Sequence, residues 1–194
     1  YWVPSHSGQF LPILNGVFCT WMTAATGELV SHFTYRRARR PVSDEGRTIS
    51  EILFIAATVT ACWASILEWR SFCRMAYQTI GGQADEIFIK GLLCIIALTA
   101  VVITAVGLGY RSILIRTTGI AAAVASMLGL VMIFGNTGDY RLIYNRLFGT
   151  WLVVGLCAAA QHWLYRYWKE PQKSYPAWSQ LFYGAAVFVL LGTG

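Results

Sequence analysis

Charged residues are scarce in this chain. Only 12% of its 194 residues are Asp, Glu, Lys or Arg, whereas soluble domains contain roughly 25%. Hydrophobic residues make up 56% of the chain. So few charges cannot cover the surface of a soluble domain of this length, which excludes that class. The chain is therefore predicted to be an integral membrane protein.

The chain also lacks paired cysteines and catalytic motifs. Its five cysteines form no CxxC pair, and no HExxH helix, GxSxG elbow or GxxxxGK[ST] phosphate loop occurs. Asp and Glu are too scarce in the apolar segments to supply a metal site. These absences argue against a disulfide framework, hydrolytic chemistry and ATP-driven transport. We therefore assign no catalytic and no metal-binding residue, and an enzyme is not the favoured class.

What the chain does have is six long apolar stretches with short polar connections. A helix needs ~20 apolar residues to cross the hydrocarbon layer of a bilayer, so six crossings use nearly the whole sequence. The fold is predicted to be all-α, a single bundle of about six transmembrane helices. The predicted spans are 10–35, 50–69, 87–110, 113–135, 147–165 and 176–194.

Local signals place the ends of the second span. Thr48 and Glu51 have the spacing of a capping box, in which a hydroxyl and a carboxylate satisfy free N–H groups at a helix start. The second helix is therefore predicted to begin near Ser50. Trp69 is expected to anchor its far end at the membrane interface.

The cations predict the orientation of the bundle. If the first span runs from side A to side B, ten of the fifteen Lys and Arg residues lie on side B. Short cytoplasmic loops carry an excess of Lys and Arg, so side B is predicted to be the cytoplasmic or matrix face, opposite the amino end. The side-B cations are Arg36, Arg37, Arg39, Arg40, Arg47, Arg111, Arg116, Arg166, Lys169 and Lys173.

Arg36, Arg37, Arg39 and Arg40 form the densest basic cluster. A nucleic-acid site is one interpretation of such a cluster, but a membrane-flanking cluster is what the orientation rule requires. Arginines at this position also bind anionic lipid headgroups. We therefore predict contact with lipid headgroups and no nucleic-acid partner.

Four polar residues lie inside the spans near side B. A charged group at a span centre costs roughly 2.5–3.5 kcal/mol on insertion scales, so Glu28 requires an explanation. His32 follows it by four residues on the same helix face, and Arg116 and His162 lie at similar predicted depth. These four residues are the predicted intramembrane polar cluster.

Three interpretations of this cluster remain open. In the structural one, Glu28 pairs with Arg116 and the histidines bond to carbonyls or lipid phosphates. In the second, His32 and His162 ligate a haem or a chlorophyll-type cofactor from two helices. In the third, the four residues form a site for a proton relay, a substrate or a lipid headgroup.

Small residues four apart predict close helix contacts. Such pairs let helix backbones approach each other where hydrophobicity no longer drives association. The pairs are Ala105 with Gly109, Gly119 with Ala123, Ala125 with Gly129, and Gly155 with Ala159.

Two short segments resemble a known family. Residues 4–8, Pro-Ser-His-Ser-Gly, precede a span, and residues 161–163, Gln-His-Trp, close a late one. This arrangement resembles the multispan family that includes autophagy-modulator and GPI-anchor remodelling membrane proteins. The resemblance implies lipid remodelling in an endomembrane. The polar residues typical of that family at span starts are mostly absent and the sixth span departs from its pattern, so we do not assign the chain to it.

Three function classes follow. Small, basic, Trp-rich multispan chains are often accessory subunits of larger membrane assemblies, such as respiratory complexes, and this is the favoured class, with other membrane subunits and bound lipids as partners. The alternatives are a lipid-handling protein or small transporter that uses the polar cluster, and a haem- or pigment-binding subunit. Without paired cysteines, the mitochondrial inner membrane is our first expectation, and the endoplasmic reticulum and bacterial membranes are the alternatives.

Overall fold

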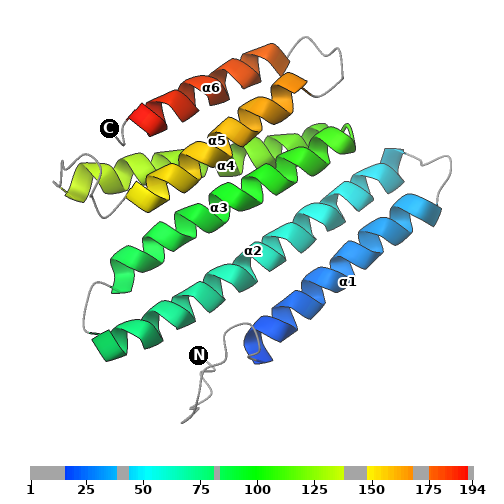
Figure 1. The fold of residues 1–194 in the computed structure, drawn as a ribbon. Coiled ribbons are helices and arrows are strands. Elements are labelled where there is room, and N and C mark those ends of the chain that lie inside the picture. Colours follow the sequence, from blue (N-terminus) through cyan, green and yellow to red (C-terminus); the bar gives the residue numbers. More distant parts are fainter. Residues whose placement is uncertain (1–15, 39–43, 81–83, 138–147, 168–174, 192–194) are drawn as a thin grey trace. The chain divides into compact units, whose positions relative to one another are not determined.

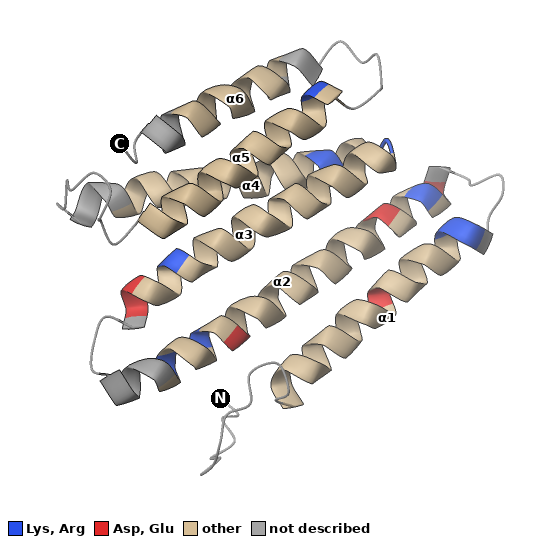
Figure 2. Cartoon of the chain, viewed as in Figure 1, with Lys and Arg blue, Asp and Glu red and all other residues tan. Residues whose placement is uncertain are grey.

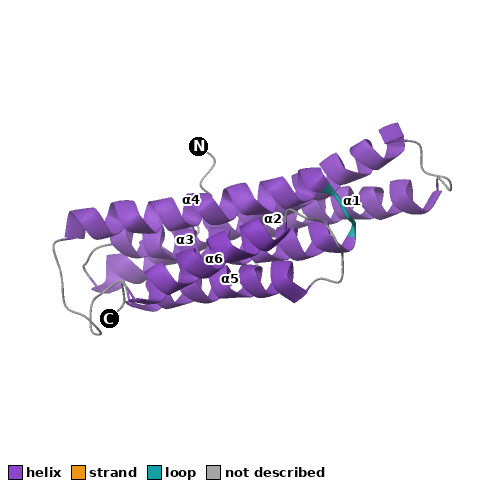
Figure 3. Cartoon of the chain, turned by 90° about the horizontal axis from the view of Figure 1, so that it is seen from above, coloured by secondary structure: helices purple, strands orange, loops and turns teal. Residues whose placement is uncertain are grey.

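The computed structural model describes residues 16–38, 44–80, 84–137, 148–167 and 175–191, and this part of the chain is helical except for one tight turn. Figure 1 shows the helices in chain order, and Figure 3 shows the turn between the third and the fourth. The prediction of an all-α fold is confirmed for these residues. The helices are α1 (Gly16–Ala38), α2 (Asp44–Ile80), α3 (Ala84–Gly109), α4 (Ile113–Thr137), α5 (Phe148–Tyr167) and α6 (Tyr175–Leu191).

Among the residues that the structure describes, three helical segments are both long and apolar enough to cross a membrane: Glu45–Met75 in α2, Asp85–Gly109 in α3 and Ile113–Ile133 in α4. This supports a membrane protein but only half of the six predicted spans. In α1, the polar side chains between Thr20 and His32 lower the hydropathy. The described part of α6 has only 17 residues.

The chain divides into two compact units, residues 1–84 and 85–194. In the first unit, α1 and α2 pack together as a helical hairpin. The prediction that Thr48 and Glu51 cap the start of this second helix is wrong, because α2 begins at Asp44. Glu51 instead pairs with Arg47 one turn earlier, with 3.1 Å between Oε1 and Nε.

At its other end α2 continues to Ile80, well past the predicted span end at Trp69. Hydropathy reports the thickness of the apolar layer, whereas the helix ends where its backbone hydrogen bonds end. Residues such as Glu68, Arg70 and Arg74 are good helix formers, so the helix extends beyond its apolar part.

The second unit contains α3, α4, α5 and α6. The turn between α3 and α4 is a Schellman motif: Ser112 N–H donates to the carbonyl of Gly107 over 3.0 Å, and Arg111 N–H donates to that of Leu108 over 3.2 Å. Arg111 occupies the left-handed position with φ 54°. These bonds satisfy the last carbonyls of α3 and bring α4 back along it.

Glycines hold α3 and α4 close together. A Cβ added at Gly119 would lie 2.9 Å from the backbone N of Thr104 and 3.2 Å from the carbonyl O of Ala100, and one at Gly129 would lie 2.6 Å from Leu93 Cδ2. Two of the predicted small-residue positions are therefore confirmed as close contacts, and their partner is α3.

Two hydrophobic clusters join the four helices of the second unit. The first cluster is Leu93, Ala97, Leu130, Trp151, Val154 and Cys157, from α3, α4 and α5. The second is Ala100, Leu108, Ala123, Tyr165 and Phe182, and it adds α6. The helix α5 thus packs against both α3 and α4 with one continuous face.

Candidate functional site

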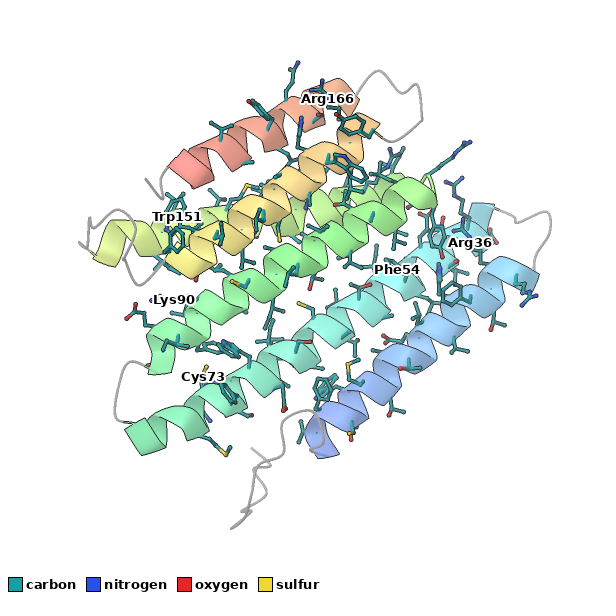
Figure 4. The ribbon with its side chains drawn as sticks, in the orientation of Figure 1. Arg36, Phe54, Cys73, Lys90, Trp151 and Arg166 are labelled. Carbon is teal, nitrogen blue, oxygen red and sulfur yellow. The ribbon has the colours of Figure 1, made fainter. Side chains whose placement is uncertain are left out.

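His32 joins the two helices of the first hairpin. Its side chain is fully buried, and its Nδ1 lies 2.6 Å from the carbonyl O of Ser50 and 2.9 Å from Ser50 Oγ. A carbonyl oxygen only accepts hydrogen bonds, so Nδ1 carries the proton and donates. The imidazole ring also lies 5.5 Å from the ring of Phe54, one turn further along α2. Figure 4 labels Phe54 on α2.

His162 makes the same contacts between α5 and α6. Its Nδ1 lies 2.8 Å from the carbonyl O of Ser179 and 2.9 Å from Ser179 Oγ. Its ring lies 5.2 Å from that of Tyr183, which follows Ser179 by four residues. The first and last hairpins are therefore closed by the same His–Ser pair, and each pair is supported by an aromatic ring.

This equivalence extends along the sequence as an internal repeat. When residues 13–41 are aligned without gaps on residues 143–171, nine positions are identical. In the second helix of each hairpin, Ser50, Ala56 and Ala57 align with Ser179, Ala185 and Ala186. The nine identical pairs are Ile13/Ile143, Asn15/Asn145, Phe18/Phe148, Thr20/Thr150, Trp21/Trp151, His32/His162, Tyr35/Tyr165, Arg36/Arg166 and Pro41/Pro171.

The repeat accounts for the similar depth predicted for His32 and His162, but sequence reasoning missed the repeat itself. The serines were missed altogether, because serine is common and its role depends on a partner 17 or 18 residues away. Comparison of the sequence with itself aligns the serines at a spacing of 129 residues, one less than the spacing of 130 residues that aligns the histidines.

The middle hairpin has a different closure. Tyr110 and Arg111 directly follow α3, whereas Tyr35 and Arg36 lie near the end of α1, and Gly107 stands where the histidine would be. A Cβ on Gly107 would lie 2.8 Å from Arg116 Cγ. Arg116 is buried, and its Nε donates to the carbonyl of Ser112 over 3.0 Å.

Glu28 lies in the middle of α1, one turn before His32, and is half-buried. Its Oε2 is enclosed, and among the described residues it has no hydrogen-bond partner. Glu28 and His32 belong to the first unit and Arg116 and His162 to the second. The predicted cluster of these four residues, and the Glu28–Arg116 pair, therefore stay predictions.

The haem interpretation also stays a prediction. Nδ1 of each histidine is used by its serine, so a metal would have to bind at Nε2. Within the described residues, no three His, Cys, Asp or Glu side chains are arranged to hold a metal ion.

Of the predicted lipid-contacting arginines, Arg36 and Arg37 lie in the last turn of α1, where cations complement the helix dipole. Arg37 is exposed. Arg39 and Arg40 lie outside the described residues. Figure 2 shows charged residues gathered mainly toward the helix ends, and Figure 4 labels Arg36 and Arg166 at the ends of α1 and α5.

No known protein family, curated protein or solved structure matches this chain.

Proposed function

We propose that the chain is a six-span integral membrane protein that serves as a non-catalytic accessory subunit of a larger membrane assembly. One observation carries this proposal: buried and half-buried polar side chains hold helices to one another. His32 bonds to Ser50, His162 to Ser179, and Thr104 Oγ1 donates to Gln161 Oε1 over 3.4 Å between α3 and α5. Polar side chains used in this way stabilise a scaffold within the membrane.

Packing supports six spans rather than three. The helix α1 packs along α2, which contains a candidate span, and α5 and α6 share hydrophobic clusters with α3 and α4. At 23 residues, α1 is about 35 Å long, enough to cross the ~30 Å hydrocarbon layer. Its hydroxyls are compatible with lipid because Thr20, Thr23 and Thr26 each donate to the carbonyl four residues earlier.

The charges of the second unit support the predicted orientation. Arg111 and Arg116 lie at the turn between α3 and α4, and Arg166 lies in the last turn of α5. Because antiparallel helices alternate direction, these three residues share one end of the unit. The other end of α3 carries Lys90, which pairs with Glu86. We propose the end that carries these three described arginines as the cytoplasmic or matrix face.

The accessory role predicts that the protein migrates with other polypeptides. After extraction from its native membrane in a mild detergent, it should run on a native gel in a species much larger than the monomer. Deletion of its gene should reduce that species at least severalfold, and re-expression of the wild-type chain should restore it. A solitary monomer whose deletion leaves every membrane assembly intact would refute the accessory role.

Glu28 favours a second candidate function, the handling of phospholipid. An enclosed carboxylate oxygen without a partner among the described residues, one turn from a histidine, is the kind of group that relays protons or binds a polar ligand in a membrane. If this function holds, Glu28→Gln should slow the exchange of fluorescent phosphatidylserine between leaflets of reconstituted vesicles at least tenfold. Glu45→Gln, at an exposed position of α2, should have no effect. Equal rates in wild type and Glu28→Gln would exclude this function.

A further inference from the structure

We infer that Thr104 and Gln161 form a polar layer that fixes the register of α5 against α3. The inference concerns the interior of the second unit alone and goes beyond the proposed function, since it holds whether or not the chain is an accessory subunit. A register-fixing role differs from a stabilising one: the pair excludes shifted packings more strongly than it strengthens the native packing.

The polar layer interrupts an apolar seam between the two helices. Thr104 is fully buried and Gln161 is 1% exposed. The residues one turn before and one turn after each of them belong to the two hydrophobic clusters: Ala100 and Leu108 on α3, and Cys157 and Tyr165 on α5. The hydrogen bond between Thr104 and Gln161 is therefore enclosed by apolar side chains on both sides.

Residue spacing defines the register of the seam. The two residues of the polar layer are 57 residues apart. The same separation applies to Ala97 and Val154, which belong to the first cluster, and to Leu108 and Tyr165, which belong to the second. The helices α3 and α5 thus run in the same direction with one constant register.

Gly119 of α4 makes room for the hydroxyl of the polar layer. A Cβ at Gly119 would overlap Thr104 Oγ1, so this hydroxyl occupies the space that a side chain would otherwise fill. From there Oγ1 donates to Gln161 Oε1 over 3.4 Å. The polar layer therefore lies where α3, α4 and α5 meet.

A shifted packing differs from the native one mainly in this layer. If α5 slid by one turn, Ala97 would meet Ala158 in place of Val154, which changes the apolar contacts little. Gln161 would instead face Ala100, and its buried amide would lose its hydrogen-bond donor. A buried amide left unpaired costs more than a hydrogen bond between membrane helices contributes. Single buried polar residues fix the register of coiled coils in the same way.

Cysteine cross-linking of the full chain in vesicles measures the register. In a chain whose native cysteines are replaced with alanine, Ala97→Cys with Val154→Cys reports the native register, and Ala97→Cys with Ala158→Cys reports a slide by one turn. Thr104→Val combined with Gln161→Leu should raise the ratio of shifted to native cross-links at least tenfold.

Ser126→Ala is the matched control for this experiment. Ser126 is also a buried hydroxyl of the second unit, but it donates to the carbonyl of Ala123 on its own helix over 2.8 Å. Its removal should leave the cross-link ratio unchanged. Thr104→Ser, which keeps the hydroxyl of the polar layer, should also give the native ratio.

Unfolding by SDS separates register from stability. Thr104→Val alone should raise the unfolding equilibrium constant at least tenfold, because it leaves the Gln161 amide unpaired. The double variant should change this constant by less than about threefold, since it removes both partners together.

Three results would overturn the inference. An unchanged cross-link ratio in the double variant means that the shape of the side chains sets the register. A double variant that is as unstable as Thr104→Val, or that fails to accumulate, means that the pair is a stabilising bond. A ratio raised equally by Ser126→Ala means that the polar layer has no special part in the register.

Discussion

Replacing Gly119 with valine is expected to lower the free energy of unfolding by about 3 kcal/mol, at the upper end of the usual range for overpacking a well-packed core. Even the first added carbon would lie 2.9 Å from the backbone N of Thr104 and 3.2 Å from the carbonyl O of Ala100. Backbone atoms of a helix cannot move aside one at a time, so α3 and α4 must separate. The measurement is unfolding by SDS in mixed micelles, followed by helical circular dichroism.

Gly129→Val is the matched control. It makes the same change on the same helix, but the atom in the way is Leu93 Cδ2, at the far end of a flexible side chain. Leu93 can change rotamer, so the expected loss is about 1 kcal/mol. Equal losses in the two variants would show that α3 and α4 do not approach most closely at Gly119.

His32→Ala is expected to cost about 3 kcal/mol of unfolding free energy in the same assay. The change removes the buried hydrogen bond to the Ser50 carbonyl and leaves a cavity beside Phe54. His162→Ala should cost about half as much, because His162 is only half-buried and water replaces part of what is lost.

Asparagine at position 32 tests whether the hydrogen bond to Ser50 holds α1 to α2. Its side-chain N–H₂ lies close to where Nδ1 of histidine lies, so His32→Asn should recover about half of the stability lost in His32→Ala. If alanine and asparagine are equally destabilising, the ring packing rather than the hydrogen bond closes the hairpin. If neither variant loses stability, the His–Ser pair has no part in holding α1 to α2.

Several features could be predicted from local sequence because their causes are local. Apolar stretches such as those in α3 and α4 indicate membrane helices, and the glycines at 119 and 129 indicate close packing, since both depend on the residue type alone. The start of α2 could not be placed in the same way. Thr48 and Glu51 have the spacing of a capping box, yet Glu51 is equally suited to pair with Arg47 inside a longer helix, and local sequence does not decide between these two uses.

For the histidines too, local sequence predicts one property and not another. Their depth near the arginines follows from counting residues along a helix, but their partners do not, because Ser50 and Ser179 reach them only after the chain has turned back. The repeat can be found in the sequence alone. Only the structure shows that its two His–Ser pairs have the same geometry.

The sequence by itself determined that this is a helical protein with segments apolar enough to span a membrane, because hydropathy and the scarcity of charge act residue by residue and need no partner. The tertiary structure alone decided how far each helix extends, which serine closes each hairpin, and which face of α5 is buried against α3 and α4. These properties depend on residues far apart in the chain being brought together, and a side chain such as Trp21 or Trp151 has the same sequence signal whether it is covered or free.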